Sequence, residues 1–176
     1  RGLAWLRLLQ RVKGYRIRAV CDPIVALHEK GLAVLESPGE VRAYARYEDM
    51  LADSNVDAVA VTVRCREQGA LAAQALEAGK HVNSEVPAAH TMDDCWRIVL
   101  AAERSGLVYN LAEQTRYHGF VQPWRDLVAG GQLGRVTFCE GQYFGYYGTH
   151  QLSQDPETGR FFGVEELPEH PEARPT

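Results

Sequence analysis

The stretch Ala78-Gly79-Lys80-His81-Val82-Asn83-Ser84-Glu85-Val86-Pro87-Ala88-Ala89 decides the fold. An apolar helix runs into this stretch and ends at Gly79, which adopts the left-handed conformation without a Cβ penalty. A short strand begins at His81, and Pro87, which has no backbone N–H, ends it. Glu85 therefore follows the carboxyl end of a strand, where ligands bind in open α/β sheets. A solvated loop carboxylate is the alternative interpretation of Glu85.

Strands and helices alternate on both sides of this stretch. The clearest strand covers residues 57–63, because its run is β-branched and almost unbroken, as in a parallel sheet covered on both faces. Such alternation is typical of βαβ units in a doubly wound sheet. We expect strands at residues 15–21, 41–45, 57–63, 81–85 and 107–112, and helices at residues 2–12, 24–35, 47–52, 67–78, 92–105 and 121–129.

The helix that follows Pro87 carries clear end signals. Thr91 is its expected N-cap with Asp94 three residues later, and Gly106 ends it. Helical spacing predicts that its apolar face consists of Met92, Cys95, Trp96, Val99 and Ala102.

The pattern changes after residue 117. Residues 135–147 alternate between apolar and polar side chains, which is typical of an antiparallel sheet with one wetter face. We therefore expect a dinucleotide-binding domain at residues 1–117. Residues 118–176 are expected to begin a C-terminal α/β substrate domain, with an irregular tail from about residue 150.

Composition excludes several classes of protein. Hydrophobic residues make up 45% and charged residues 24%, as in an ordinary globular protein. The net charge of −4 and the scattered basic residues argue against a nucleic-acid or anionic-membrane partner, and no apolar run is long enough for a membrane helix. The four cysteines form no C-x-x-C pair, so we expect buried thiols in a cytoplasmic protein and no metal site.

A dinucleotide site on such a sheet needs a glycine-rich turn after the first strand and an acid about twenty residues later. Asp22 is such an acid at a strand end, with a turn-forming Asp-Pro as the alternative. The glycine-rich turn is not in the sequence, which begins with Arg1-Gly2 and a helix. We therefore expect the first strand to lie upstream of Arg1, and the 176-residue chain to be inactive alone.

Several segments in register resemble the Gfo/Idh/MocA family of nicotinamide-dependent oxidoreductases, named after glucose–fructose oxidoreductase and inositol dehydrogenase. Residues 79–87 resemble its Gly-Lys-His-Val-x-x-Glu-Lys-Pro, residues 114–117 its Asn-x-Arg-Phe, and residues 131–136 its Gly-x-Leu-Gly-x-Val. Residues 59–64 match its strand ending Ala-Thr-Pro, and Asp22 its ribose-binding acid. The resemblance implies a Rossmann-like doubly wound parallel sheet, here without its first strand, followed by the start of an α+β domain with an antiparallel sheet.

The resemblance also implies a cofactor and its site. Glu85 and Gln114 would line the nicotinamide end, Val63 and Arg64 would flank it, and Asp22 would hold the adenosine ribose. No arginine directly follows Asp22 to receive a 2′-phosphate, which favours NAD, with NADP as the alternative.

By the same resemblance, Arg116 and Tyr117 are expected to contact a small carbohydrate or polyol. The Arg116 guanidinium offers a fork of donors, although a surface ion pair is the alternative for it. The full-length protein is expected to be a homo-oligomer through its C-terminal sheet.

Three departures from the family pattern bear on activity. Val86 replaces the motif lysine, residues 64–68 replace Pro-x-x-x-His, and most of the second domain is absent. The expected function is an NAD(P)-dependent oxidoreductase that transfers a hydride between nicotinamide and a sugar, polyol or related hydroxyl compound. One alternative is an NAD-dependent glycosidase of the same superfamily, which uses oxidation and elimination. The other is a non-catalytic dinucleotide-binding protein.

Overall fold

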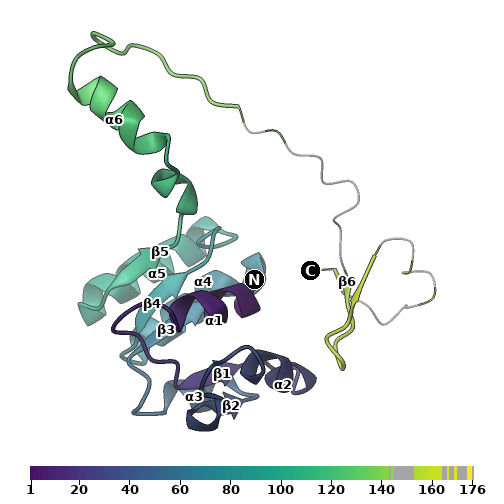
Figure 1. Ribbon diagram of the computed structural model, residues 1–176. Helices are drawn as coiled ribbons and strands as arrows, with labels where there is room; N and C mark the ends of the chain where they lie inside the picture. The colour runs from purple at the N-terminus through teal and green to yellow at the C-terminus, as the bar shows by residue number, and fades with distance from the viewer. Residues whose placement is uncertain (143, 145–152, 164–165, 167–168, 170–173, 176) are drawn as a thin grey trace.

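The computed structural model describes residues 1–142, 144, 153–163, 166, 169 and 174–175 (Figure 1). Its helices are α1 (Gly2–Leu9), α2 (Ala26–Leu32), α3 (Tyr47–Leu51), α4 (Cys65–Glu77), α5 (Met92–Ser105) and α6 (Val121–Ala129), with 3₁₀ helices η1 (Pro38–Glu40) and η2 (Gln114–Tyr117). Its strands are β1 (Ala19–Cys21), β2 (Arg42–Tyr44), β3 (Ala58–Val61), β4 (His81–Ser84), β5 (Tyr109–Leu111), β6 (Ser153–Gln154), β7 (Phe161–Phe162) and β8 (Arg174–Pro175).

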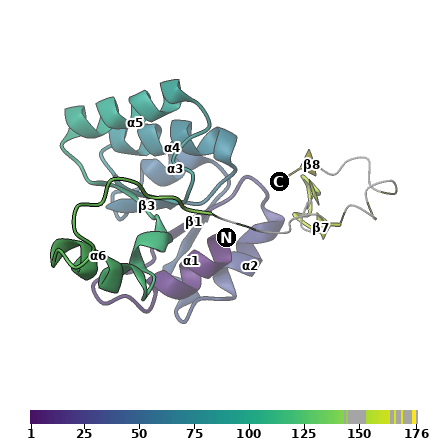
Figure 2. The ribbon, with the colours of Figure 1, turned by 90° about the horizontal axis from the view of Figure 1, so that it is seen from above.

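The first two-thirds of the chain form three layers. Helices α3, α4 and α5 cover one side of the parallel strands, and α1 and α2 cover the other (Figure 2). This arrangement confirms the predicted doubly wound α/β fold. Each predicted helix and strand up to residue 129 is present, α5 and α6 with the predicted ends and the others with one or both ends shifted.

The parallel strands form two separate sheets. Strand β1 pairs with β2, while β3, β4 and β5 form a second sheet in which Val59 lies opposite Val82 and Val82 opposite Tyr109. Among the described residues, no strand pairs with the outer edge of β1 or of β3. The break lies between these two strands, where the strand order of a doubly wound sheet places its first strand.

The core is centred on α4. Ala72, Ala73 and Ala75 are fully buried and Leu76 is 1% exposed, because these small and apolar side chains pack between the β3–β4–β5 sheet and α5. Gly69 sets the distance between the two helices, since a Cβ on it would lie 2.7 Å from the Cβ atoms of Ala89 and Asp94. In contrast, α1 buries no residue and every residue of β1 is half-buried.

The predicted ends of α5 are confirmed, but its predicted apolar face is only partly correct: Ala102 packs against the core and Cys95 is half-buried, whereas Met92, Trp96 and Val99 are exposed. The Thr91 side chain accepts a hydrogen bond from the Asp94 N–H at 3.1 Å, and Gly106 has a left-handed φ of 65°. Ile98 and Ala101 are the buried residues of α5, whereas Met92 is 70% and Trp96 60% exposed. The close approach at Gly69 turns the face with Asp94, Ile98 and Ala101 toward α4, because residues three and four apart share one helix face.

The prediction of an antiparallel strand at residues 135–147 is also wrong over the described residues of this range. Residues 135–142 and 144 form no strand, and residues 143 and 145–147 lie outside the described part. An alternating segment becomes a strand only when a neighbour completes its ladder, and none of the described strands pairs with this one. Cys139 on this segment is exposed, so the expectation of a buried thiol fails there.

An antiparallel sheet does form, in the order β7-β6-β8, within the region expected to be an irregular tail. Asp155 builds the turn between β6 and β7, because its carboxylate accepts hydrogen bonds from the backbone N–H groups of Glu157 and Thr158. Gly159 ends this turn with a φ of 65°. Asp and Gly at these positions are turn signals that the sequence contained.

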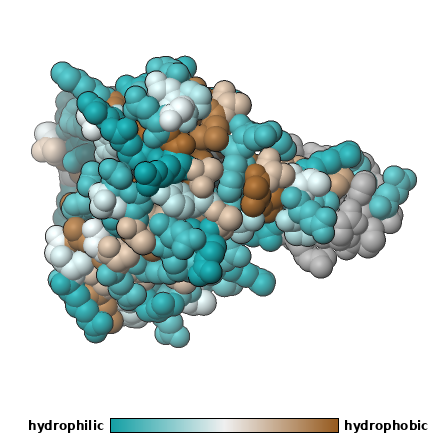
Figure 3. All heavy atoms as spheres, turned by 90° about the horizontal axis from the view of Figure 1, so that it is seen from below, coloured by the Kyte–Doolittle hydropathy of each residue, from teal (hydrophilic) through white to brown (hydrophobic). Residues whose placement is uncertain are grey.

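The outer surface is mixed in character. The face shown in Figure 3 is mostly hydrophilic, with small separate hydrophobic patches. Across the described residues, every helix falls short of the length and apolar character that crossing a membrane requires.

We expect Gly69→Ala to destabilise the fold, because the added Cβ would collide with Ala89 and Asp94 at 2.7 Å. Overpacking of this kind costs about 1–3 kcal/mol. Gly39→Ala is the matched control, since a Cβ on Gly39 meets no atom within 4 Å. Urea unfolding of both variants measures the difference, and equal midpoints would contradict the close packing of α4 on α5.

We expect the stability of the fold to depend on Asp53 in acid. The hydrogen bond from the Tyr44 hydroxyl, at 2.6 Å, and those from Asn55 lower the pKa of Asp53 from 3.8 to about 2. A lowered carboxyl pKa stabilises the folded state above the unfolded value of about 3.9, and this contribution is lost as the pH falls through the folded value.

The free energy of unfolding should therefore fall less steeply between pH 4 and 2 in Asp53→Asn than in the parent. Asp57→Asn is the control, since the Asp57 side chain accepts no hydrogen bond among the described residues and should keep the parent slope. Urea titrations at several pH values measure these slopes. An unchanged slope in Asp53→Asn would contradict the role of the Tyr44 hydrogen bond.

Candidate functional site

The carboxyl ends of the parallel strands bring four loops to one edge of the molecule. Asp22 follows β1, residues 62–64 follow β3, Glu85 follows β4, and η2 begins shortly after β5. The start of α1 lies at the same edge, since a Cβ on Gly2 would lie 3.3 Å from the Thr62 hydroxyl. Ligands bind at this edge in open α/β sheets, so the site is built here.

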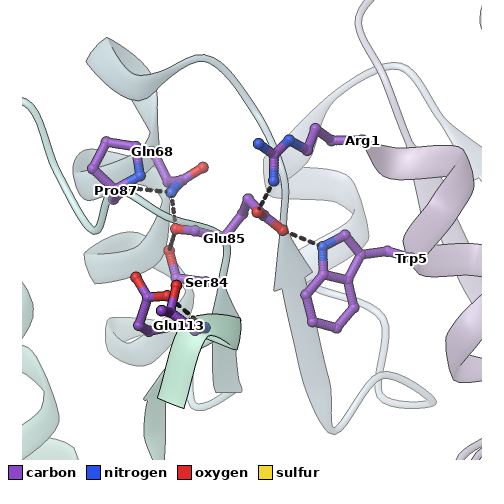
Figure 4. A network of polar contacts seen from close by, with 8 residues as sticks. Arg1, Trp5, Gln68, Ser84, Glu85, Pro87 and Glu113 are labelled. Atoms are coloured by element: carbon purple, nitrogen blue, oxygen red, sulfur yellow. Dashed lines mark hydrogen bonds and ion pairs between the residues drawn. The ribbon is translucent and has the colours of Figure 1, made fainter. Parts of the chain in front are cut away.

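Glu85 is buried at the centre of this edge, with 9% of its surface exposed. Its carboxylate forms an ion pair with the Arg1 guanidinium and accepts a hydrogen bond from the Trp5 indole N–H (Figure 4). The Glu85 backbone N–H donates to the Val61 carbonyl at 2.9 Å and so continues the strand ladder. These contacts exclude a solvated loop carboxylate, and they tie Glu85 to the start of α1.

The side chain of Gln68 fixes the turn that carries Glu85. Gln68 lies on α4, is 1% exposed, and donates through its amide to the backbone carbonyls of Glu85 and Pro87. Figure 4 shows the amide pointing at this turn from the side opposite Arg1 and Trp5. In the sequence, Gln68 stands out only as one of residues 64–68, which replace the family's Pro-x-x-x-His.

The contacts from α1 were missed altogether by the sequence analysis. Periodicity of α1 gave no sign that Arg1 and Trp5 point toward a residue eighty positions later. The usable signal was the indole N–H of Trp5, because a partly buried tryptophan usually places this donor on an acceptor.

Asp22 forms the turn that one of its two interpretations predicted, and its role toward a ribose stays a prediction. Its Oδ1 accepts a hydrogen bond from the Ile24 N–H at 2.8 Å, and its backbone carbonyl is 2.8 Å from the His28 Nε2, so it does build the turn after β1. Its Oδ2 has no hydrogen-bond partner among the described residues. One carboxylate oxygen therefore remains for a ligand.

The other predicted residues are exposed on the loops around this edge. Val63 is 42% exposed, and Arg64 is the N-cap of α4. Gln114, Arg116 and Tyr117 lie on η2, and in the described part of the chain none of them is hydrogen-bonded to Glu85. They follow the strand ends along the chain, but among the described residues none of them is a hydrogen-bond or ion-pair partner of the Glu85 carboxylate.

The 3₁₀ helix η2 is held by its own first residues. Glu113 accepts a hydrogen bond from the Thr115 N–H at 2.8 Å, and hydrogen bonds from the Thr115 side chain and backbone lower the pKa of Glu113. The Arg116 guanidinium lies 5.2 Å from the centre of the Tyr117 ring, a cation–π contact. Arg116 forms no ion pair within the described residues, which does not support the surface-ion-pair alternative.

The start of α1 offers free donors. The Ala4 and Trp5 N–H groups bond to the Arg1 carbonyl, whereas the Gly2 and Leu3 N–H groups meet no acceptor among the described residues. Unpaired N–H groups and the positive end of the helix dipole suit an anion such as a phosphate.

Comparisons with known proteins identify the family. The family model described as "Oxidoreductase family, NAD-binding Rossmann fold" matches residues 3–113. The chain is 27% identical over 164 residues to Glycosyl hydrolase family 109 protein 2 of Phocaeicola vulgatus, covering 90% of this chain and 40% of that protein. It is 29% identical over 141 residues to inositol 2-dehydrogenase of Salmonella typhimurium, covering 78% of this chain and 41% of that protein.

A solved structure shows the same fold. The WlbA dehydrogenase from Bordetella pertussis, in complex with NADH and UDP-GlcNAcA, matches with a TM-score of 0.63 and 26% identity over 73% of this chain and 36% of that chain. The chain thus spans 40% and 41% of the length of the two curated relatives. Because the family model covers more than half of the sequence and includes Asp22 and Glu85, the chain belongs to the Gfo/Idh/MocA oxidoreductase family and contains its NAD-binding Rossmann fold.

Proposed function

We propose that the whole protein is an NAD-dependent oxidoreductase that transfers a hydride between nicotinamide and a sugar, polyol or related hydroxyl compound. The observation that carries the proposal is the shared edge at which the free N–H groups of α1, the Asp22 oxygen and Glu85 meet. The relationship to inositol 2-dehydrogenase supports the substrate class. NADP is the alternative cofactor.

In this proposal each part of the edge holds one part of the cofactor. The Gly2 and Leu3 N–H groups bind the pyrophosphate, and the Asp22 Oδ2 accepts from the adenosine ribose hydroxyls. Glu85 lies at the nicotinamide end, flanked by residues 63–64 and Gln114. The bound nicotinamide supplies the hydride chemistry, and the protein supplies its orientation.

Glu85 has a second task in this proposal. By holding Arg1 and Trp5, its carboxylate fixes the start of α1 over the strand ends. The donors of Gly2 and Leu3 are then presented at the same edge as Asp22. The pairing also places the positive charge of Arg1 close to the proposed pyrophosphate position.

Fewer residues of this chain are assigned to the substrate than to the cofactor. Arg116 and Tyr117 are proposed to contact the carbohydrate or polyol, and the 77% exposure of Tyr117 leaves its ring accessible. A homo-oligomer through the C-terminal sheet remains a prediction. The strand at residues 135–147 that was expected to build that sheet is not formed in the described residues.

An NAD-dependent glycosidase is the second candidate function. Two observations favour it: Val86 stands in place of the motif lysine, and a relative is a Glycosyl hydrolase family 109 protein. Valine can neither hydrogen-bond a substrate hydroxyl nor transfer a proton. Such an enzyme would oxidise the sugar transiently, eliminate the aglycone and reduce the sugar again.

Turnover assays on the whole protein separate the candidates. An oxidoreductase forms NADH with a member of a polyol and sugar panel, seen by near-ultraviolet absorbance. A glycosidase cleaves a nitrophenyl glycoside without net NADH and loses activity when NAD is removed. Tight NAD binding with no reaction on either panel would favour the non-catalytic alternative and contradict both.

We expect Glu85→Ala to weaken NAD binding by the whole protein. The change removes the carboxylate at the proposed nicotinamide end and releases the start of α1, which carries the proposed pyrophosphate donors. It also leaves the Trp5 indole N–H without an acceptor, and an unpaired polar group costs about 1–3 kcal/mol. Stability should fall as well, because Glu85 is buried, whereas a carboxylate at the rim of a cleft would have left it unchanged.

Glu85→Gln and Arg1→Gln make the prediction specific. Glu85→Gln keeps an acceptor for Trp5 but loses the charge that pairs with Arg1, so NAD binding should weaken less than in Glu85→Ala. Arg1→Gln shows how much of the effect passes through α1. Isothermal titration with NAD measures all three. Equal affinity of Glu85→Ala and the parent would remove Glu85 from the cofactor site.

A further inference from the structure

The first residue of α4 is a cysteine that lies beside a histidine from another segment. Cys65 starts this helix, and His90 follows the turn that Gln68 holds. The Cys65 Sγ lies 3.9 Å from the His90 Nδ1, within hydrogen-bond distance for sulfur. Two of the five residues that replace the family's Pro-x-x-x-His are arginines, Arg64 and Arg66, on either side of the thiol.

This arrangement suits a nucleophilic thiol with its own base. The imidazole Nδ1 can accept the thiol proton while the sulfur attacks an electrophile, which is the geometry of a nucleophile and its general base. Cys65 is half-buried and His90 exposed, so the pair is accessible from solvent. Reactive cysteines typically lie in such partly exposed and electropositive places.

The surrounding charges favour an anionic reaction partner. Arg64 and Arg66 are exposed and flank Cys65 at the positive end of a 13-residue helix. Of the two acids in the first turn of α5, Asp94 is already engaged: its N–H and carboxylate bond to Thr91, and Arg97 lies 3.5 Å from the same carboxylate. Asp93 and Glu67, the latter in the first turn of α4, form no ion pair among the described residues and partly offset the two arginines.

We propose that Cys65 and His90 form a thiol-exchange site for small anionic disulfides of the glutathione type. The Cys65 sulfur attacks one sulfur of the disulfide, whose S–S bond breaks as a new S–S bond forms to Cys65. The Cys65 proton passes to the His90 Nδ1 and then to the departing thiolate. Cys65 is thereby oxidised to a mixed disulfide, and the other half of the small disulfide is reduced to a thiol.

The other cysteines provide internal references. Burial, followed by the neighbouring charges of Asp22, Glu48 and Asp49, raises the pKa of Cys21 to about 11, so Cys21 should react slowly. Cys139 is exposed and has no histidine partner among the described residues, so it reports the rate of an accessible but unassisted thiol.

The test follows each thiol separately in the 176-residue chain treated with glutathione disulfide. Cleavage after glutamate places Cys21, Cys65, Cys95 and Cys139 on different peptides, residues 1–29, 49–67, 86–103 and 114–140, whose masses report each adduct. Cys65 should react faster than Cys139. His90→Asn should slow Cys65 by about tenfold or more while leaving Cys139 unchanged, since general-base assistance is worth at least that much.

Two controls locate the cause. His118→Asn removes an exposed histidine that has no cysteine contact among the described residues and should change neither rate. Arg66→Gln should slow Cys65 with glutathione disulfide but not with cystamine, which is cationic. A Cys65 rate no greater than that of Cys139, or a His90→Asn rate equal to the parent, would overturn the proposal. Because the readout is peptide mass, either result leaves the proposed NAD-dependent function untouched.

Discussion

The hydrogen bonds from the Gln68 amide to the carbonyls of Glu85 and Pro87 are the interaction on which the rest of the structure depends. These carbonyls lie past the end of β4, where the strand ladder no longer satisfies them, and an unpaired buried acceptor costs about 1–3 kcal/mol. One buried side chain on α4 therefore holds the turn that follows β4. The neighbouring Gly69 lets Ala89, after this turn, and Asp94, on α5, pack closely against α4.

The turn that Gln68 holds also joins the two halves of the parallel-stranded region. Strands β1 and β3 do not pair, so side chains must connect the halves. At the carboxyl edge, Glu85 does so through Arg1 and Trp5. A second link joins α3 to α4, because the Tyr47 hydroxyl on α3 donates to the Leu71 carbonyl on α4 at 3.1 Å. The same carboxylate that the family resemblance assigns to the cofactor site thus also holds the fold together there.

The site follows from this architecture, but the substrate does not. Parallel strands place Asp22, Glu85 and η2 at one edge whatever reaction the protein performs, and one fold can host many functions. Both inositol 2-dehydrogenase and a Glycosyl hydrolase family 109 protein are relatives that this chain matches over 41% and 40% of their lengths. The differences between such enzymes have to be sought in side chains such as Val86, rather than in the sheet.

The sequence by itself determined the order of the helices and strands, the cap of α5 at Thr91 and the place of Glu85 at a strand end, because these depend on local patterns of apolar, capping and turn residues. The rest required the tertiary structure. The buried face of α5 depends on a contact at Gly69, and the partners of Glu85 come from the start of the chain, about eighty residues away. The segment at residues 135–142 has no neighbouring strand within the part of the chain that the structure describes. Such contacts are set by packing between distant segments, which local spacing does not encode.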